Sequence, residues 1–189
     1  MQNRGAAATY PVSAQELMTL ADGRMRYELV QGEVRCMTPA GFRHGVIAQR
    51  LAQRLSVYVE SADLGVVVAA ETGFQIGHDP DTVRAPDIAF VSRERAPARD
   101  RLTGYYPGAP DLAVEVISVG DRYVDVSQKT ADWLSAGVRQ VWVVDPQLCQ
   151  VAMYRSATDV QILTEKDTLE GGTMLPGFAC PVAEIFCVR

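Results

Sequence analysis

The sequence contains no long run of apolar residues. Along its 189 residues, no stretch approaches the roughly 20 consecutive apolar residues that a membrane-spanning helix requires. The N-terminus also lacks the charged and then apolar layout of a signal peptide, and no repeat or low-complexity segment is visible. We therefore expect a cytoplasmic protein that makes no contact with a membrane.

Cysteine is scarce, and its spacing excludes the common zinc motifs. The four cysteines form no C-x-x-C pair and have no histidine at zinc-binding spacing; they are Cys36, Cys149, Cys180 and Cys187. We expect them to be buried free thiols, as is usual for a protein of the reducing cytoplasm.

Positive charge is also in short supply. The chain has 18 Lys and Arg against 23 Asp and Glu, which gives a net charge of −5 and a pI near 5.0. Proteins that bind phosphates usually carry a basic face, so this balance counts against a nucleic-acid-binding protein. Part of the acidity would belong to a metal site, because a bound ion neutralises its carboxylates.

The chain does have enough apolar residues to build a core. Hydrophobic residues make up 48% of the sequence, which at this length favours one folded domain over a disordered chain. We expect this single domain to span residues 13–189. The first residues are small and polar, so segment 1–12 is predicted to be frayed or disordered.

Apolar periodicity predicts an α/β fold in which helices flank a mixed β-sheet. Ser13 and Glu16 have the spacing of a capping box, which predicts a short helix beginning after Ser13. Gln31-Gly32 separates two strand-like runs and predicts an N-terminal β-hairpin. The remaining predicted helices are 42–62 and 124–135, and the remaining predicted strands are 65–70, 73–76, 84–91, 111–118, 140–144 and a terminal hairpin of 151–154 with 160–163.

Two of the predicted strands each contain one carboxylate among apolar residues. Asp87 lies in the run 84–91 and Glu115 in the run 111–118. A carboxylate in a buried strand is costly unless it is paired or coordinates a metal ion. Strand alternation gives each carboxylate small or apolar neighbours on its own face, namely Ala85 and Ala89 for Asp87, and Ala113 and Ile117 for Glu115. These neighbours would leave room for an ion and its waters.

Lys129 follows the Glu115 strand on the next predicted helix. It lies at the margin of the apolar stripe of that helix, so its stem can lie against the sheet while its ammonium reaches the carboxylates. Magnesium takes hard oxygen ligands, often one or two carboxylates, and retains several waters. Such an ion activates water toward a phosphodiester, and a lysine beside it can stabilise developing charge. The three side chains predict a divalent-metal site built for hydrolysis.

Short motifs spread along the chain support this interpretation together, although Pro-Asp alone would carry no weight. They are Tyr27–Glu33, His44 at the start of the long helix, Arg84–Asp87, Pro110–Leu112 with Glu115–Ser118, Asp125 with Lys129, and Ala136–Val138 before Val141–Pro146. With these motifs the chain resembles the PD-(D/E)XK nuclease superfamily and, more closely, the Uma-type family of restriction endonucleases, which are bacterial proteins of about this length. The resemblance runs from about Tyr27 to Phe186.

This resemblance implies a restriction-endonuclease-like core with an N-terminal hairpin and a C-terminal β-hairpin. It implies a metal-dependent DNA endonuclease that uses Mg²⁺ or Mn²⁺, with Asp87, Glu115 and Lys129 as catalytic residues. Glu28 would join Asp87 and Glu115 as a metal ligand. DNA is the expected partner, and a homodimer is the expected assembly.

Several of these positions have a second interpretation. His44 and Ser118 are expected to be auxiliary residues, and His44 could equally contact phosphate or cap its helix. Glu28 could be a surface residue of the hairpin, and Lys129 could be a solvated helix residue. Glu115 could point outward from an edge strand.

The chain departs from the family pattern at two places. The superfamily lysine usually stands two residues after the acidic residue, but Ile117 occupies that position, so Lys129 is the candidate for its role. Val119-Gly120 replaces the usual proline after Ser118. The main alternative is a catalytically silent member of the same fold that serves as a nucleic-acid or protein interaction module, which the acidic pI favours. Hydrolysis of another phosphoester also stays open.

Overall fold

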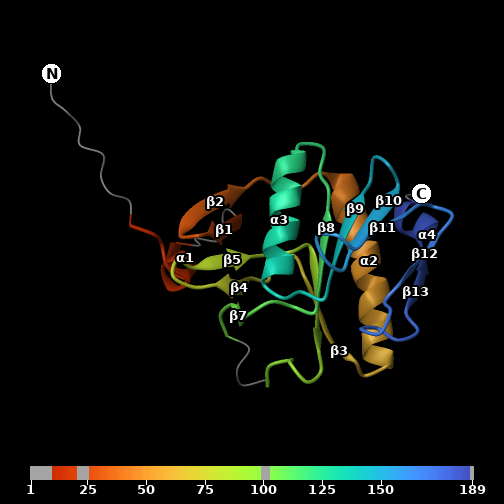
Figure 1. Cartoon of the computed structure of the whole chain (residues 1–189), viewed down its shortest axis with the longest axis horizontal. Helices are drawn as coiled ribbons and strands as arrows, with labels where there is room; N and C mark the ends of the chain where they lie inside the picture. Colours follow the sequence, from red (N-terminus) through yellow and green to blue (C-terminus); the bar gives the residue numbers. More distant parts are fainter. Residues whose placement is uncertain (1–9, 21–25, 99–102, 188–189) are drawn as a thin grey trace.

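A short helix and a five-stranded sheet form the N-terminal side of the molecule (Figure 1). The structure, a computed structural model, describes residues 10–20, 26–98 and 103–187. The predicted capping box opens helix α1 (Ala14–Leu20), because Ser13 N donates to Glu16 Oε2 at 2.8 Å and Glu16 N to Ser13 Oγ at 3.2 Å. The sheet has the order β2-β1-β5-β4-β7, with β1 at Arg26–Val30, β2 at Glu33–Met37, β4 at Phe74–Gly77, β5 at Thr82–Arg84 and β7 at Tyr106–Pro107.

A six-stranded mixed sheet forms the centre of the fold. Its order is β11-β10-β9-β8-β6-β3, in which β8 and β9 are parallel and the other neighbours antiparallel. The strands are β3 (Gly65–Ala69), β6 (Ile88–Ser92), β8 (Leu112–Val116), β9 (Gln140–Asp145), β10 (Gln150–Tyr154) and β11 (Val160–Leu163). The predicted mixed sheet and C-terminal hairpin are therefore confirmed.

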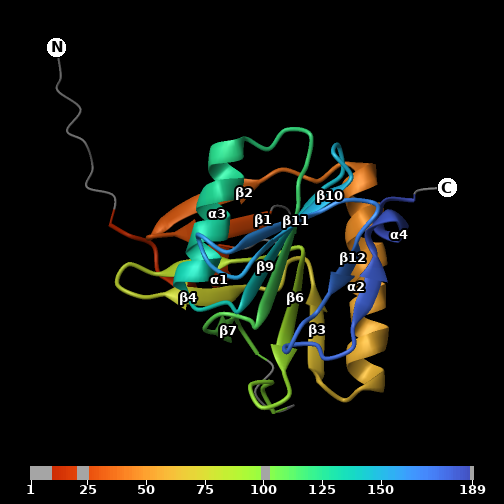
Figure 2. The same ribbon diagram turned by 45° about the vertical axis from the view of Figure 1, so that its right-hand side comes forward.

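The two long helices cover opposite faces of this sheet. Figure 2 shows α3 (Tyr123–Ser135) on one side and α2 (Phe42–Ser61) on the other. Alternation along β8 separates the two cores: Val114 packs in the cluster that contains the buried residues of α2, whereas Ala113 packs with Trp133 of α3. Glu115, which follows Val114, therefore points toward α3.

The chain passes from the five-stranded to the six-stranded sheet between β5 and β6. The sequence predicts one continuous strand over 84–91, and this prediction is wrong, because residues 85–87 lie outside both strands. Pro86 has no backbone N–H for a ladder hydrogen bond and also restricts the residue before it. Asp87 consequently precedes β6 instead of lying within it, and its backbone N–H donates to Val114 O at 3.1 Å.

The C-terminal segment contains more regular structure than the sequence predicts. The apolar pattern predicts no helix or strand after residue 163, but β12 (Thr168–Glu170) pairs with β13 (Ala179–Pro181), and α4 (Val182–Phe186) follows. The apolar residues Leu175 and Phe178 between the two strands are buried in the core on the α2 side. Strands of three residues are too short to show a period of two, so the pattern conceals them.

The N-terminal expectation concerns residues that are only partly described. Residues 1–9 of the predicted frayed segment lie outside the described residues. Val12, in the same segment, donates its N–H to Gly32 O at 2.9 Å and is held against the hairpin. Within the described ranges, no helix has the length and apolar character to cross a membrane.

The cysteines agree with the sequence prediction in one respect and contradict it in another. All four are free, but only Cys180 is buried. Cys36 and Cys187 are exposed, which corrects the expectation of four buried thiols. Cys36 is exposed because it lies in β2, an edge strand whose residues all face solvent.

Candidate active site

Glu115 is held between the central sheet and α3. Its Oε1 accepts a hydrogen bond from Trp133 Nε1 at 2.8 Å, and its Oε2 lies 2.9 Å from Lys129 Nζ. Only 12% of the side chain is exposed. Because β8 lies between β6 and β9, Glu115 is not an outward-facing residue of an edge strand.

The Lys129 ammonium is surrounded by three acceptors. Its Nζ lies 2.9 Å from Glu115 Oε2 and 3.0 Å from Glu28 Oε1, and it donates to Ala85 O at 3.1 Å. An ammonium has three N–H donors, so these acceptors satisfy it. Burial would lower the pKa of Lys129, but the Glu115 and Glu28 charges outweigh burial and raise it. The structure thus brings Lys129 to Glu115, as the sequence predicts.

Asp87 lies beside Glu115 where the chain enters β6. Its Oδ2 accepts a hydrogen bond from Val116 N at 2.8 Å and lies 3.1 Å from His44 Nε2. Its Oδ1 has no hydrogen-bond partner in the part of the chain that the structure describes, and 16% of the side chain is exposed. Glycine at position 41 is the N-cap of α2, so His44 is not its cap. His44 holds one oxygen of Asp87 and leaves the other available.

Glu28 lies behind Lys129, in β1, and is a buried residue of the hairpin. Its Oε2 accepts from Arg84 Nη1 at 2.7 Å, and its Oε1 accepts from Ala85 N at 3.0 Å and faces Lys129. The side chain is 3% exposed, which excludes the interpretation as a surface residue. Burial alone would raise the pKa of Glu28, but the charges of Lys129 and Arg84 bring it below its ordinary value.

Three side chains of the site are not among the predicted functional residues. Arg84 is almost fully buried and joins Glu28 to Asp132 of α3, and Trp133 donates to Glu115. The sequence predicts no functional role for Trp133. Asp132 and Trp133 stand three and four residues after Lys129, and this helical spacing is the signal that could have placed them beside it.

The charges of the site shift the pKa of Glu115 strongly. Burial raises this pKa, and the neighbouring Asp87 and Glu28 carboxylates add to the effect, so that it reaches about 7 despite the opposing charge of Lys129. Burial and the neighbouring carboxylates thus oppose the ionised form of Glu115, which Lys129 favours. An added cation would stabilise the ionised form.

The pKa of Asp87, which is paired with His44, is shifted in the opposite direction to that of Glu115. Burial raises the pKa of Asp87, but the hydrogen bond and charge of His44 and the N–H of Val116 outweigh burial and hold the pKa below its ordinary value. The same hydrogen bond raises the pKa of His44. Asp87 is consequently ionised near neutral pH.

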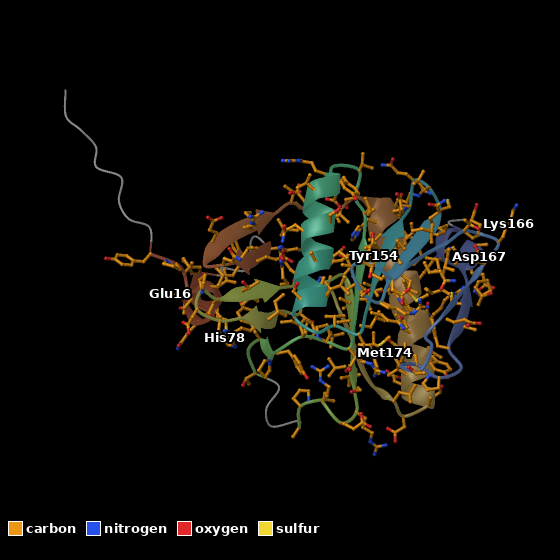
Figure 3. All side chains as sticks on the ribbon, in the orientation of Figure 1. Glu16, His78, Tyr154, Lys166, Asp167 and Met174 are labelled. Carbon is orange, nitrogen blue, oxygen red and sulfur yellow. The ribbon has the colours of Figure 1, made fainter. Side chains whose placement is uncertain are left out.

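Ser118, the other predicted auxiliary residue, and His78, the second histidine of the chain, lie apart from this cluster. Ser118 belongs to the turn between β8 and α3, where its backbone N–H donates to Asp121 Oδ2 at 2.7 Å; within residues 10–20, 26–98 and 103–187, its hydroxyl has no hydrogen bond to the carboxylates. His78 is exposed and lies at the outer end of the five-stranded sheet, away from α3 (Figure 3).

The donor set fits a hard divalent cation held by two carboxylates. Asp87 Oδ1 accepts a hydrogen bond from none of the described residues, and each carboxylate oxygen of Glu115 accepts one hydrogen bond although it has two lone pairs. Magnesium is commonly bound by one or two carboxylates with waters completing its shell. Among the described residues, no group of three or more His, Cys, Asp or Glu side chains is placed to hold a metal ion.

Comparison with solved structures identifies the fold that carries this cluster. A crystal structure from Anabaena variabilis, described as "a putative nuclease belonging to DUF820", is similar with a TM-score of 0.80 and 17% identity over 93% of this chain and 98% of that chain. At this identity the likeness shows a shared fold. No curated protein matches the chain.

A family model identifies the chain more closely. The model of the Uma2 family, described as "Putative restriction endonuclease", matches residues 14–183. Because this match covers most of the 189 residues, the chain belongs to the Uma2 family. Fold and family together indicate a nuclease.

Proposed function

We propose that this protein is a metal-dependent endonuclease that hydrolyses phosphodiester bonds in DNA. The observation that carries the proposal is the position of the Lys129 ammonium, 2.9 Å from Glu115 Oε2, with Asp87 beside them. Two acidic oxygen donors and a fixed positive charge are what phosphoryl chemistry requires, because it depends mainly on positioning and charge neutralisation.

Asp87 and Glu115 would hold one Mg²⁺ or Mn²⁺ ion. When bound, such an ion makes a water molecule more acidic and neutralises charge on the phosphate. His44 holds Asp87 Oδ2 and Trp133 holds Glu115 Oε1, so the remaining carboxylate oxygens are oriented before the ion arrives. Preorganisation of this kind removes the cost of ordering the ligands.

Lys129 would supply the positive charge that the reacting phosphate needs. Its ammonium cannot ligate a metal because it has no lone pair when charged, and its raised pKa keeps it charged. The lysine therefore stabilises the charge that develops on the phosphate oxygens. Its loss is expected to slow cleavage about 10²–10³-fold while metal affinity stays close to that of the wild type.

The direct test is nicking of supercoiled plasmid DNA by the pure protein with Mg²⁺, Mn²⁺ or EDTA. Cleavage is expected with either ion and not with EDTA. Asp87→Ala from the same preparation procedure controls for contaminating nucleases. Equal cleavage by wild type and Asp87→Ala would reject the assignment of this site.

The net charge of −5 favours one second candidate, a catalytically silent module of the same fold. The same preparation separates the two candidates. A silent module would bind its partner without cleaving DNA in either metal, and Lys129→Met would then affect stability only.

A further inference from the structure

Glu28 has more partners within the described part of the chain than either of the other two carboxylates of the site. Three groups bind it, whereas Glu115 is bound by Trp133 and Lys129 only, and Asp87 by two groups that share one oxygen. Oε2 accepts from Arg84, and Oε1 accepts from Ala85 N and faces Lys129 at 3.0 Å. Its side chain is 3% exposed, against 16% for Asp87. Asp87 keeps an oxygen that no described group binds, and Glu28 does not.

Arg84 links Glu28 to α3 at a second residue, Asp132, in addition to the contact of Glu28 with Lys129. Its Nη1 donates to Glu28, whereas its Nε and Nη2 both bind Asp132 Oδ2, with Nε at 3.1 Å. The other Asp132 oxygen accepts from Gln128 Nε2 at 2.8 Å. Lys129 and Asp132 are one helical turn apart, so Glu28 and Arg84 hold α3 at two adjacent places on the same face.

These two contacts matter because Lys129 and Glu115 belong to different elements. Lys129 reaches Glu115 from α3, while Glu115 projects from β8, so the distance between them depends on how the helix is rotated over the sheet. Glu28 in β1 and Arg84 in β5 fix that rotation from the neighbouring five-stranded sheet. Ala85 O supplies the third acceptor of the ammonium at 3.1 Å.

Rotation of Glu28 toward a cation would undo this arrangement. Lys129 would lose one of its three acceptors, and the nearly buried Arg84 would lose a partner at 2.7 Å. Breaking a buried ion pair by removal of one partner is strongly unfavourable, because it leaves an uncompensated charge. The contacts therefore favour Glu28 as a partner of cations within the chain over Glu28 as a metal ligand.

We infer that Glu28 and Arg84 are positioning residues that set the location of Lys129, and that Asp87 and Glu115 alone hold the catalytic ion. The part of this inference that concerns catalysis rests on the proposed nuclease function. The part that concerns the contacts between Glu28, Arg84 and Lys129 does not.

Calorimetric titration with Mn²⁺ separates a positioning residue from a ligand without any activity measurement. Glu115→Gln is expected to raise the Mn²⁺ Kd at least about tenfold, as loss of even an outer-shell partner does. Glu28→Gln is expected to raise the Kd clearly less than Glu115→Gln does, because it removes a nearby charge but no ligand. Glu184→Gln is the matched control, because Glu184 pairs with Arg54 at 2.6 Å on another part of the surface.

Plasmid cleavage at saturating Mn²⁺ then tests whether Glu28 acts through Lys129. Glu28→Gln alone is expected to slow cleavage about 10- to 100-fold, as part of the loss expected without the lysine. In a Lys129→Met background, the same substitution should change the rate less than about twofold, because the two residues act as one unit. Urea unfolding of the same four proteins in EDTA measures the coupling without metal, and the two single destabilisations should sum to more than that of the double variant.

Arg84→Lys provides a second variant that keeps the buried charge but removes the fork that joins Glu28 to Asp132. It should also slow cleavage with little change in Mn²⁺ affinity. If Glu28→Gln does not fold, Arg84→Lys tests in its place whether the contact between Glu28 and Arg84 positions Lys129. The inference is overturned if Glu28→Gln weakens Mn²⁺ binding as much as Glu115→Gln, or if its effects are additive with Lys129→Met. Wild-type protein that binds no Mn²⁺ and cleaves nothing would overturn the proposed function instead, and the coupling in EDTA would still decide whether Glu28 holds Lys129.

Discussion

Glu115 is the residue whose charge depends most on its surroundings. Burial raises its pKa to about 7 from an ordinary value of 4.5, so between these values the folded chain holds a proton that the unfolded chain has released. Stability therefore falls as the pH rises through this window. The carboxylate that is suited to bind a cation is also the one that costs stability when the cation is missing.

Glu115→Gln should remove this pH dependence. In EDTA the free energy of unfolding of the wild type is expected to fall by ~1–3 kcal/mol more than that of Glu115→Gln between pH 5 and pH 8, since one pKa unit corresponds to about 1.4 kcal/mol. Urea unfolding at both pH values measures the difference. Mg²⁺ should restore the free energy of unfolding of the wild type at pH 8 and leave that of Glu115→Gln unchanged. Parallel pH curves for the two proteins would show that Glu115 titrates normally.

Trp133→Phe should separate the two tasks of the tryptophan, which are packing and donation to Glu115. Loss of the indole N–H leaves Glu115 Oε1 without its donor, so we expect the Mn²⁺ Kd to rise about 10- to 100-fold and the free energy of unfolding to fall by ~1–3 kcal/mol. Trp142→Phe is the matched control, because Trp142 is equally buried and donates to Gln140 Oε1 at 2.9 Å. A Kd change shared by both variants would assign the effect to general loosening.

The sequence alone points to the three proposed catalytic residues, whereas it does not point to the residues that hold them. Asp87 and Glu115 are conspicuous because a carboxylate is out of place in an apolar strand, and Lys129 lies on the next helix. Arg84 and Trp133 carry no such signal, because a single sequence does not show which side chains a buried arginine or tryptophan meets. The role of Arg84 depends on how β5 meets α3, and the role of Trp133 depends on how α3 packs against β8.

At the level of secondary structure, α2 anchors the central sheet. It buries one stripe, which consists of Ile47, Leu51, Leu55 and Val59, and each of these residues is 0% exposed. The opposite side of the helix faces solvent, and Val57 there is 63% exposed. The apolar period predicts both the helix and the buried stripe correctly.

Leu51→Ala and Val57→Ala should show how unevenly the stability of α2 is distributed. Leu51→Ala is expected to lower the free energy of unfolding by ~2–5 kcal/mol because it leaves a cavity in the core. Val57→Ala is expected to change it by less than ~0.5 kcal/mol. Chemical unfolding of both variants measures the contrast. Equal losses would indicate that the exposed side of α2 is covered in solution.

The features that the sequence did not predict are those that leave no signal in the local pattern of apolar and polar residues. The break at residues 85–87 separates two strands that read as one apolar run, and only Pro86 hints at it. The short strands β12 and β13 pair across eight intervening residues, 171–178, so their partners are defined by tertiary packing. The long helices and the two hairpins have complete local signals, and all of them are present.

For the molecule as a whole, the acidic balance conflicts with a DNA substrate unless basic residues gather near the site. Helices α2 and α3 both begin at the same end of the molecule (Figures 1 and 2). Arg43 is the second residue of α2 and Arg122 is the N-cap of α3, and both are exposed. His44, next to Arg43, contacts Asp87. This end therefore carries two exposed arginines, of which Arg122 lies with its Nε 3.8 Å from Asp125 Oδ2.

Arg43→Glu combined with Arg122→Glu should weaken DNA binding more than its change of net charge alone explains. We expect at least a tenfold loss of affinity at low salt and a shallower dependence on salt concentration, because fewer phosphate contacts release fewer counterions (about one ion per contact). Fluorescence anisotropy with Ca²⁺ in place of Mg²⁺ measures binding alone. Lys166→Glu controls for charge on a distant surface (Figure 3). Because that control changes the net charge by half as much, a loss of half the size in the logarithm of the affinity would mean that no local basic surface exists.

The three-residue crossing between the sheets has a consequence for folding. The Ala85 carbonyl accepts a hydrogen bond from Lys129, and the Ala85 N–H donates one to Glu28. Asp87 follows two residues later. One short segment thus serves both sheets, and the active geometry exists only in chains in which the two sheets have docked. Amide exchange at Ala85 should therefore report global opening. Nascent or partly unfolded copies would hold no complete site, so the capacity to cut DNA would arise only at the end of folding.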